Sequence, residues 1–111
     1  MSKTYNLKWT TNAKNDLLSI VAYIKIDSPS IANDIYQKIK EKANSSNFFP
    51  LKGRVVPELQ KEGITFYREI ITSSWRIIYK VGNDTVYIMA ILDSRQNVEE
   101  LLLQKLIKAK Y

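Results

Sequence analysis

Three short apolar runs constrain the fold of this chain more than any other stretch. They cover residues 66–72, 75–81 and 85–92, and they are rich in the β-branched and aromatic residues that favour strands. The breaks between them, at residues 73–74 and 82–84, are too short for a helical crossover. Neighbouring runs can therefore pair only antiparallel, which predicts a three-stranded meander.

Helical periodicity follows a first predicted strand at residues 5–9, where apolar and polar side chains alternate. Thr10 or Thr11 can cap a helix at its start. The apolar residues that follow have the spacing of one helix face: Ala13, Leu17, Ile20, Val21 and Ile24. Ser28 then suits the N-cap of a second helix, and Pro29 suits its first turn. These features predict a helical hairpin between the first strand and the meander.

The remaining segments complete the order β-α-α-β-β-β-β-α. A proline interrupts the apolar run at residues 53–59, which indicates an edge strand or an extended loop. Asn97 can cap a last helix over residues 98–108. A helical hairpin that leaves and re-enters a mainly antiparallel sheet predicts one two-layer α+β domain over residues 1–111. The helical hairpin covers one sheet face and leaves the other partly open, and the last helix either covers some of that face or projects away.

Composition narrows the functional classes. Seventeen Lys and Arg against eleven Asp and Glu give a net charge of +6, which favours an anionic partner or serves solubility alone. The absence of Cys and His excludes zinc fingers, haem ligation, thiol nucleophiles and histidine-based catalysis, so we expect no metal or cofactor. No apolar run approaches the ~20 residues needed to span a bilayer, and the N-terminus lacks a signal-peptide core. We therefore expect a cytoplasmic protein without a membrane partner.

Cations in or beside the apolar strands define a candidate anion-binding surface, made of Arg54, Arg68, Arg76, Lys80 and Arg95. Guanidinium groups bind phosphate or carboxylate bidentately, and several in one region favour such a surface. The alternative for each arginine of the strand region is an ion pair with a nearby acidic side chain, and the candidates are Glu58, Glu69, Asp84 and Asp93.

Strand alternation predicts the side of the sheet on which these cations lie. It directs one set of β-strand side chains to the helices, namely Trp75, Ile77, Tyr79 and Val81. Arg76 and Lys80 then point to the open face. The side of Arg68 depends on residues 73–74: a strict two-residue loop pairs Arg68 with Tyr79 on the helix side, whereas a bulge or an odd-length loop aligns it with Arg76. Because two serines do not favour the positive φ of a two-residue hairpin turn, we expect Arg68 and Arg76 to share the open face.

Five short motifs resemble the RelE/ParE superfamily of bacterial type II toxin–antitoxin toxins, and they are closer to the ParE branch. They are GRVVPEL at 53–59, YREI at 67–70, WRIIY at 75–79, DTVYI at 84–88 and LDSR at 92–95. Their order and spacing extend the likeness over nearly the whole chain. The resemblance implies a small sheet backed by two helices and a toxin, often linked to plasmid stabilization, that forms a hetero-oligomer with a cognate antitoxin.

The superfamily has two branches with different targets. RelE-like members cleave messenger RNA in the ribosomal A site with basic strand residues and a late Tyr or His, whereas ParE-like members are reported to poison DNA gyrase without a recognised catalytic set. The resemblance places Arg76 and Arg95 where the nuclease branch carries arginines, and Arg68 at one of its basic strand positions. These three would be the catalytic residues of a nuclease.

Departures from the nuclease pattern favour the ParE branch. Ile70 stands where RelE-like nucleases place a second strand Lys, Leu101 stands near their late Tyr, and Asp93 stands where many members have His. We therefore interpret the chain as a ParE-like inhibitor of gyrase, more a binding protein than an enzyme. The alternatives are a ribosome-dependent endoribonuclease and a non-toxic basic binding module. An exposed basic sheet face would suit an acidic, amphipathic antitoxin segment that folds as it binds.

Overall fold

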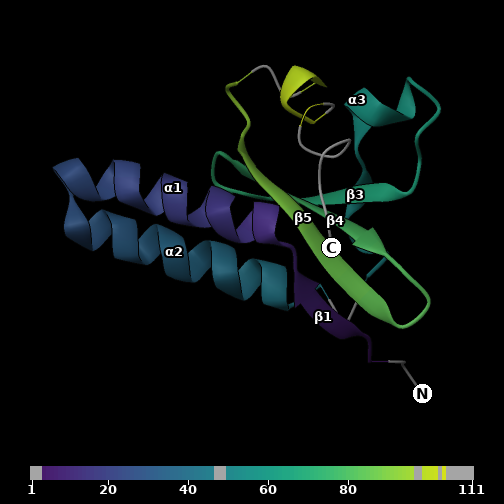
Figure 1. Ribbon diagram of the computed structural model, residues 1–111, viewed down its shortest axis with the longest axis horizontal. Helices are drawn as coiled ribbons and strands as arrows, with labels where there is room; N and C mark the ends of the chain where they lie inside the picture. The colour runs from purple at the N-terminus through teal and green to yellow at the C-terminus, as the bar shows by residue number, and fades with distance from the viewer. Residues whose placement is uncertain (1–3, 47–49, 97–98, 103, 105–111) are drawn as a thin grey trace.

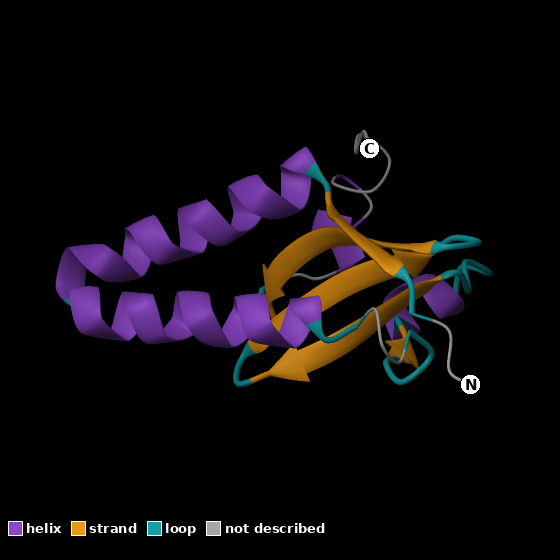
Figure 2. Ribbon diagram, turned by 90° about the horizontal axis from the view of Figure 1, so that it is seen from below, coloured by secondary structure: helices purple, strands orange, loops and turns teal. Residues whose placement is uncertain are grey.

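Two long helices and a curved five-stranded sheet form separate layers of the molecule (Figures 1 and 2). The computed structural model describes residues 4–46, 50–96, 99–102 and 104. Helices α1 (Thr11–Asp27) and α2 (Pro29–Asn44) form an antiparallel hairpin on one face of the sheet, and their linked ends extend beyond it. This arrangement confirms the predicted α+β fold.

The sheet has the strand order β1-β5-β4-β3-β2. Its centre is the predicted antiparallel meander, formed by β3 (Tyr67–Thr72), β4 (Trp75–Val81) and β5 (Thr85–Asp93). The N-terminal strand β1 (Asn6–Trp9) pairs parallel with β5 and forms one edge. At the other edge lies β2 (Arg54–Val55), which has only two residues because a proline follows it closely and begins a helix.

Capping residues fix where the hairpin helices begin. The Thr10 side chain accepts a hydrogen bond from the Ala13 N–H and donates one to the Ile88 carbonyl, so it ties the start of α1 to the sheet. Ser28 lies at the N-cap of α2 as predicted, but its side chain makes no capping hydrogen bond. The start of α2 therefore depends on the extended backbone of Ser28 and on Pro29 in the first turn.

The main core lies between the hairpin and the sheet. The inward side chains of β4 are those predicted from alternation: Ile77 and Tyr79 are fully buried there, and Trp75 and Val81 pack at the margin. They meet Leu17 of α1 and further buried residues of both helices and β5, namely Ala13, Ile39, Ala43, Val86, Ile88 and Ile91. Each large apolar side chain buried in this way contributes roughly 1.5–3 kcal/mol, so packing rather than helix propensity holds the hairpin.

The opposite face of the sheet, predicted to be partly open, carries a second apolar cluster, and of the two alternatives for the last helix the one in which it covers some of this face is confirmed. Helix α3 (Pro57–Gln60) and the helical residues 99–102 lie over it. The cluster contains Leu59, Leu102 and the apolar side chains that β4 and β5 send to this side, including Ile78, Met89 and Leu92. The predicted ends of the last helix, at residues 98 and 108, lie outside the described residues.

Side chains of helix α1 also form hydrogen bonds with the backbone of β5 at a β-bulge that the sequence pattern did not reveal. The register between β4 and β5 shifts by one residue at Met89. The Asn12 amide donates a hydrogen bond to the Met89 carbonyl at 2.9 Å, and the Asp16 carboxylate accepts one from the Ile91 N–H at 3.0 Å. Two polar side chains of α1 therefore pair backbone groups of β5 at and just beyond the bulge, where β1 no longer pairs with this strand.

Candidate functional site

Arg76 points away from the hairpin, as alternation predicts, but it is not presented to solvent. Only 5% of the residue is exposed. Its Nε donates a hydrogen bond to Glu69 at 2.6 Å, and its two terminal nitrogens each donate one to the Glu58 carboxylate at 2.7 Å. The prediction that Arg76 faces an open surface is therefore wrong, because α3 covers it and supplies Glu58. The alternative, an ion pair with Glu58 and Glu69, is confirmed.

Arg76 belongs to a row of four alternating charges that crosses the edge of the sheet. The Glu69 side chain is fully buried, and its second oxygen accepts a hydrogen bond from Arg54 at 2.6 Å. The strand register causes this contact, because β2 places Arg54 directly opposite Glu69. We call Arg54, Glu69, Arg76 and Glu58 the charge chain. Its formal charges cancel, so each buried charge has an opposite partner and little attraction for an outside anion remains.

The hydrogen bonds of the charge chain also determine the protonation states of Glu58 and Arg76. The hydrogen bonds from Arg76 hold the pKa of Glu58 below its ordinary value of 4.5. Conversely, the Glu58 carboxylate raises the pKa of Arg76, in spite of burial, which acts in the opposite direction. Both side chains therefore stay ionised at neutral pH, and neither is poised to transfer a proton.

Arg68 lies on the other side of the sheet from Arg76, so the expectation that the two share a face is wrong. Residues 73–74 form the strict two-residue turn, and Arg68 pairs with Tyr79. Ser73 makes this possible by adopting a positive φ of 54°. The Arg68 guanidinium donates a hydrogen bond to the Gly53 carbonyl at 2.7 Å and so braces the loop that leads into β2.

Arg95 and Lys80 lie apart from both arginines. Arg95 is exposed and pairs with Asp93, two residues earlier, at 2.7 Å, which confirms the ion-pair alternative. The Arg95 hydrogen bond lowers the pKa of Asp93. The half-buried Lys80 places its ammonium 5.3 Å from the centre of the Phe66 ring, within cation–π range. The five predicted cations therefore do not form one anion-binding surface: Arg54 and Arg76 share Glu69, whereas Arg68, Lys80 and Arg95 each contact a different partner.

The Tyr79 hydroxyl could in principle act as an acid or base, but here it is buried and hydrogen-bonded to the backbone of a loop. Its buried hydroxyl donates to the Pro50 carbonyl at 2.7 Å and accepts from the Gly53 N–H at 3.0 Å. Burial raises the pKa of Tyr79. Gly53 is required here, since a β-carbon would overlap the Tyr79 hydroxyl. Tyr79 therefore anchors the loop before β2.

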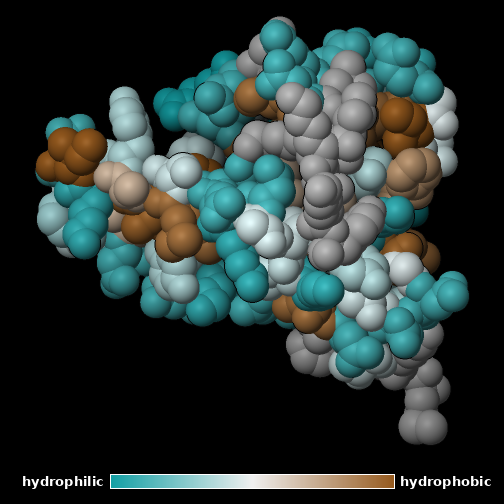
Figure 3. All heavy atoms as spheres, viewed as in Figure 1, coloured by the Kyte–Doolittle hydropathy of each residue, from teal (hydrophilic) through white to brown (hydrophobic). Residues whose placement is uncertain are grey.

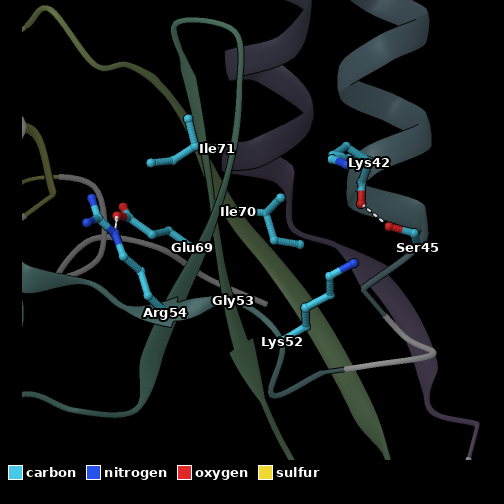
Figure 4. A pocket seen from close by; sticks show the side chains of 8 residues that line it. All are labelled: Lys42, Ser45, Lys52, Gly53, Arg54, Glu69, Ile70 and Ile71. Carbon is cyan, nitrogen blue, oxygen red and sulfur yellow. Dashed lines mark hydrogen bonds and ion pairs between the residues drawn. The ribbon is translucent and has the colours of Figure 1, made fainter.

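A shallow pocket beside β3 brings together cations that the sequence pattern did not single out. It has a volume of about 340 Å³ and lies between the end of α2, the loop before β2 and the free part of β3 (Figure 4). Its lining contains Lys42 and Lys52, both exposed and without an ion pair in the described part of the chain, next to Arg54. Ile70 and Ile71 form its apolar part.

The hairpin exposes a separate set of apolar side chains near its far end (Figure 3). Tyr23 and Ile26 are 77% and 80% exposed, Ile31 is also largely exposed, and Leu18 adds an exposed apolar side chain in the middle of α1. Such a concentration of large apolar side chains outside the core is typical of a surface that binds another protein.

The described residues contain no group of three or more metal-binding side chains. None of the described helices combines the length and apolar character required to cross a bilayer.

Two solved structures share the fold of this chain. The chromosomal ParDE toxin–antitoxin system from P. aeruginosa matches with a TM-score of 0.67 and 20% identity over 81% of this chain and 96% of that chain. The toxin–antitoxin complex RelBE2 from Mycobacterium tuberculosis matches with a TM-score of 0.56 and 19% identity over 82% and 92% of the two chains. The fold is that of RelE/ParE superfamily toxins.

The sequence itself decides the family. The model of the ParE toxin of the type II toxin–antitoxin system parDE matches residues 7–98. This chain therefore belongs to the ParE toxin family, and its class is that of a type II toxin–antitoxin toxin. A search of curated protein sequences finds no significant match.

Proposed function

We propose that this toxin arrests growth in the cytoplasm by binding DNA gyrase, and that a cognate antitoxin silences it by forming a hetero-oligomer. The family assignment supports a ParE-type target. The observation that carries the proposal is the burial of Arg76 between Glu58 and Glu69, because it removes the central cation of a nuclease site from reach.

The dispersed arginines support binding over catalysis. Cleavage of RNA through its 2′-hydroxyl needs a general base, a general acid and charge stabilisation at the phosphate. Arg76 is saturated by carboxylates, Arg68 lies on the opposite sheet face, and Arg95 pairs with Asp93. A phosphate cannot touch all three guanidinium groups at once in this arrangement. A toxin without such a set is expected to act by holding its target.

The test uses purified toxin with gyrase and relaxed plasmid. We expect inhibition of supercoiling or accumulation of cleaved DNA as toxin approaches the gyrase concentration, and reversal when antitoxin is added. No effect at saturating toxin would remove gyrase as the target. In parallel, primer extension on translated messages after induction distinguishes the endoribonuclease alternative: codon-linked cuts that disappear in Arg95→Ala would establish it.

A growth experiment tests whether the folded protein is toxic. Unimpaired growth when the folded protein is overexpressed without antitoxin would favour the non-toxic binding module. We expect growth arrest instead, with rescue by co-expression of the antitoxin.

A further inference from the structure

The outer edge of β3 is only partly covered. Strand β2 has two residues, Arg54 and Val55, and these pair with Glu69 and Arg68. Residues 70–72 of β3 pair with β4 on their inner side. No strand of the described part of the chain lies on their outer side. An unpaired strand edge is a template for another strand.

The hydrogen-bonding groups of this edge are aimed outward. The Tyr67 carbonyl accepts a hydrogen bond from the Val56 N–H, so residues of that parity direct their backbone groups away from β4. Ile71 has the same parity, four residues later. Among the described residues, Ile71 pairs only with Arg76 of β4, and the β2 pairing ends at Glu69, so no strand meets its outward N–H and carbonyl. A segment lying beside Ile71 would therefore complete a ladder that β2 begins.

The two sides of this edge differ in chemistry, as Figure 4 shows. Ile70 points to the side of α2 and the loop, where Lys42 and Lys52 stand. Ile71 points to the opposite side, together with Glu69, and is 48% exposed. An added strand would meet ammonium groups on one side and an exposed aliphatic side chain on the other.

We propose that residues 70–72 of β3 receive an extended segment of an acidic partner protein as an added strand. Carboxylates of that segment face Lys42 and Lys52, and an apolar side chain of opposite parity packs on Ile71. Backbone hydrogen bonds then supply affinity, and the alternating side chains supply specificity. The proposal rests on the proposed function only in naming the antitoxin as this partner.

The charges and shape of the edge favour this occupant over two others. A second copy of the chain would bring the same cations against Lys42, Lys52 and Arg54, and like charges across an interface oppose association. Single-stranded nucleic acid binds on exposed aromatic rings next to cations, whereas the described residues that line this pocket include no aromatic one. An acidic segment with alternating apolar side chains fits both sides of the edge.

The test titrates the ¹⁵N-labelled full chain with the capped peptide Glu-Val-Glu-Val-Glu-Val, which has the required alternation. We expect shift changes at residues 70–72 and slowing of Ile71 amide exchange by at least about ten-fold at saturation. The block isomer Glu-Glu-Glu-Val-Val-Val has the same charge without the alternation and should bind more weakly. Unperturbed Ile71, or equal binding of the two peptides, would overturn the proposal.

Charge-reversal variants supply the second arm. Lys42→Glu combined with Lys52→Glu should weaken binding of the alternating peptide by about ten-fold or more. The control combines Lys14→Glu with Lys25→Glu, two exposed positions on α1, and changes the net charge equally. Equal loss in both variants would mean that only overall charge matters and would overturn the site.

Two further outcomes separate this inference from the proposed function. A single-stranded oligoribonucleotide that perturbs the same residues and displaces the peptide would overturn the choice of a protein partner. A toxin that is silenced by its antitoxin while Ile71 exchange stays unchanged in the complex would overturn only the edge site. A chain that binds the peptide at Ile71 but does not arrest growth would overturn only the proposed toxicity.

Discussion

Replacing Arg76 with alanine should destabilise the fold by about 3 kcal/mol. Breaking a buried ion pair by removing one partner costs about 3–5 kcal/mol, because the other charge stays buried. Here Glu69 is fully buried but keeps Arg54 as a partner, and the Glu58 side chain is 27% exposed and can be hydrated. Both features move the expected loss to the lower end of that range.

The same reasoning predicts a rescue. In Arg76→Met combined with Glu69→Leu, the two buried charges are replaced by apolar side chains, while Arg54 and Glu58 can reach water. Such replacements are often close to neutral, so we expect the double variant to recover most of the loss and to lie within about 1 kcal/mol of the wild type. Arg95→Ala, which breaks only an exposed pair, should cost at most about 1 kcal/mol.

The assay is urea unfolding followed by circular dichroism and by the fluorescence of Trp9 and Trp75, with unfolding free energies compared at equal denaturant slope. Two results would refute the reasoning. One is an Arg76→Ala protein with wild-type stability, which would mean that the guanidinium is kept for a ligand. The other is a double variant as unstable as the single one, which would mean that the side-chain shape and not the charge balance matters.

Three further substitutions, each followed by urea unfolding, test other contacts that stabilise the fold. Because the pKa of Glu58 is lowered in the folded state, its ion pair should stabilise fully above pH 4.5 and fade as the pH falls below that value; the stability gap between wild type and Glu58→Gln should close in acid. Gly53→Ala should cost about 1–3 kcal/mol, since the new methyl group overlaps the Tyr79 hydroxyl, and equal stability would contradict the close packing. Asp16→Ala should cost about 1–3 kcal/mol by leaving the Ile91 N–H unpaired, with faster exchange of that amide as its signature.

Local signals in the sequence predicted most of the fold. Short breaks between apolar runs require antiparallel pairing, and Ser28 with Pro29 marks the boundary of the two helices, because each effect acts on adjacent residues. The turn at Ser73 was predicted wrongly for a physical reason. A positive φ costs a serine roughly 1–2 kcal/mol, but in return the strict two-residue turn lets β3 and β4 pair along their whole length.

The candidate site was less predictable, because its contacts join distant parts of the chain. Alternation gave the correct side for Arg76, yet its burial depends on α3, which supplies Glu58 and reaches this face by tertiary packing. From sequence alone, several acidic residues were equally suitable partners for Arg76. Only the tertiary structure shows that Glu58 and Glu69 are its partners. Lys42 and Lys52 were not predicted as site residues because one lies in the last turn of α2 and the other in a loop.

The structure separates the cations that are paired with carboxylates from Lys42 and Lys52, which have no ion pair in the described part of the chain. The charge chain contains two positive and two negative groups, and Arg95 is balanced by Asp93, so these residues contribute nothing to the net charge of +6. The excess positive charge must therefore reside elsewhere, on side chains such as Lys42 and Lys52. Electrostatic steering of an acidic partner acts through unbalanced charge and weakens with salt. It follows that substitutions in the charge chain should alter stability with little effect on the salt dependence of antitoxin capture, whereas substitutions at the edge lysines should do the reverse.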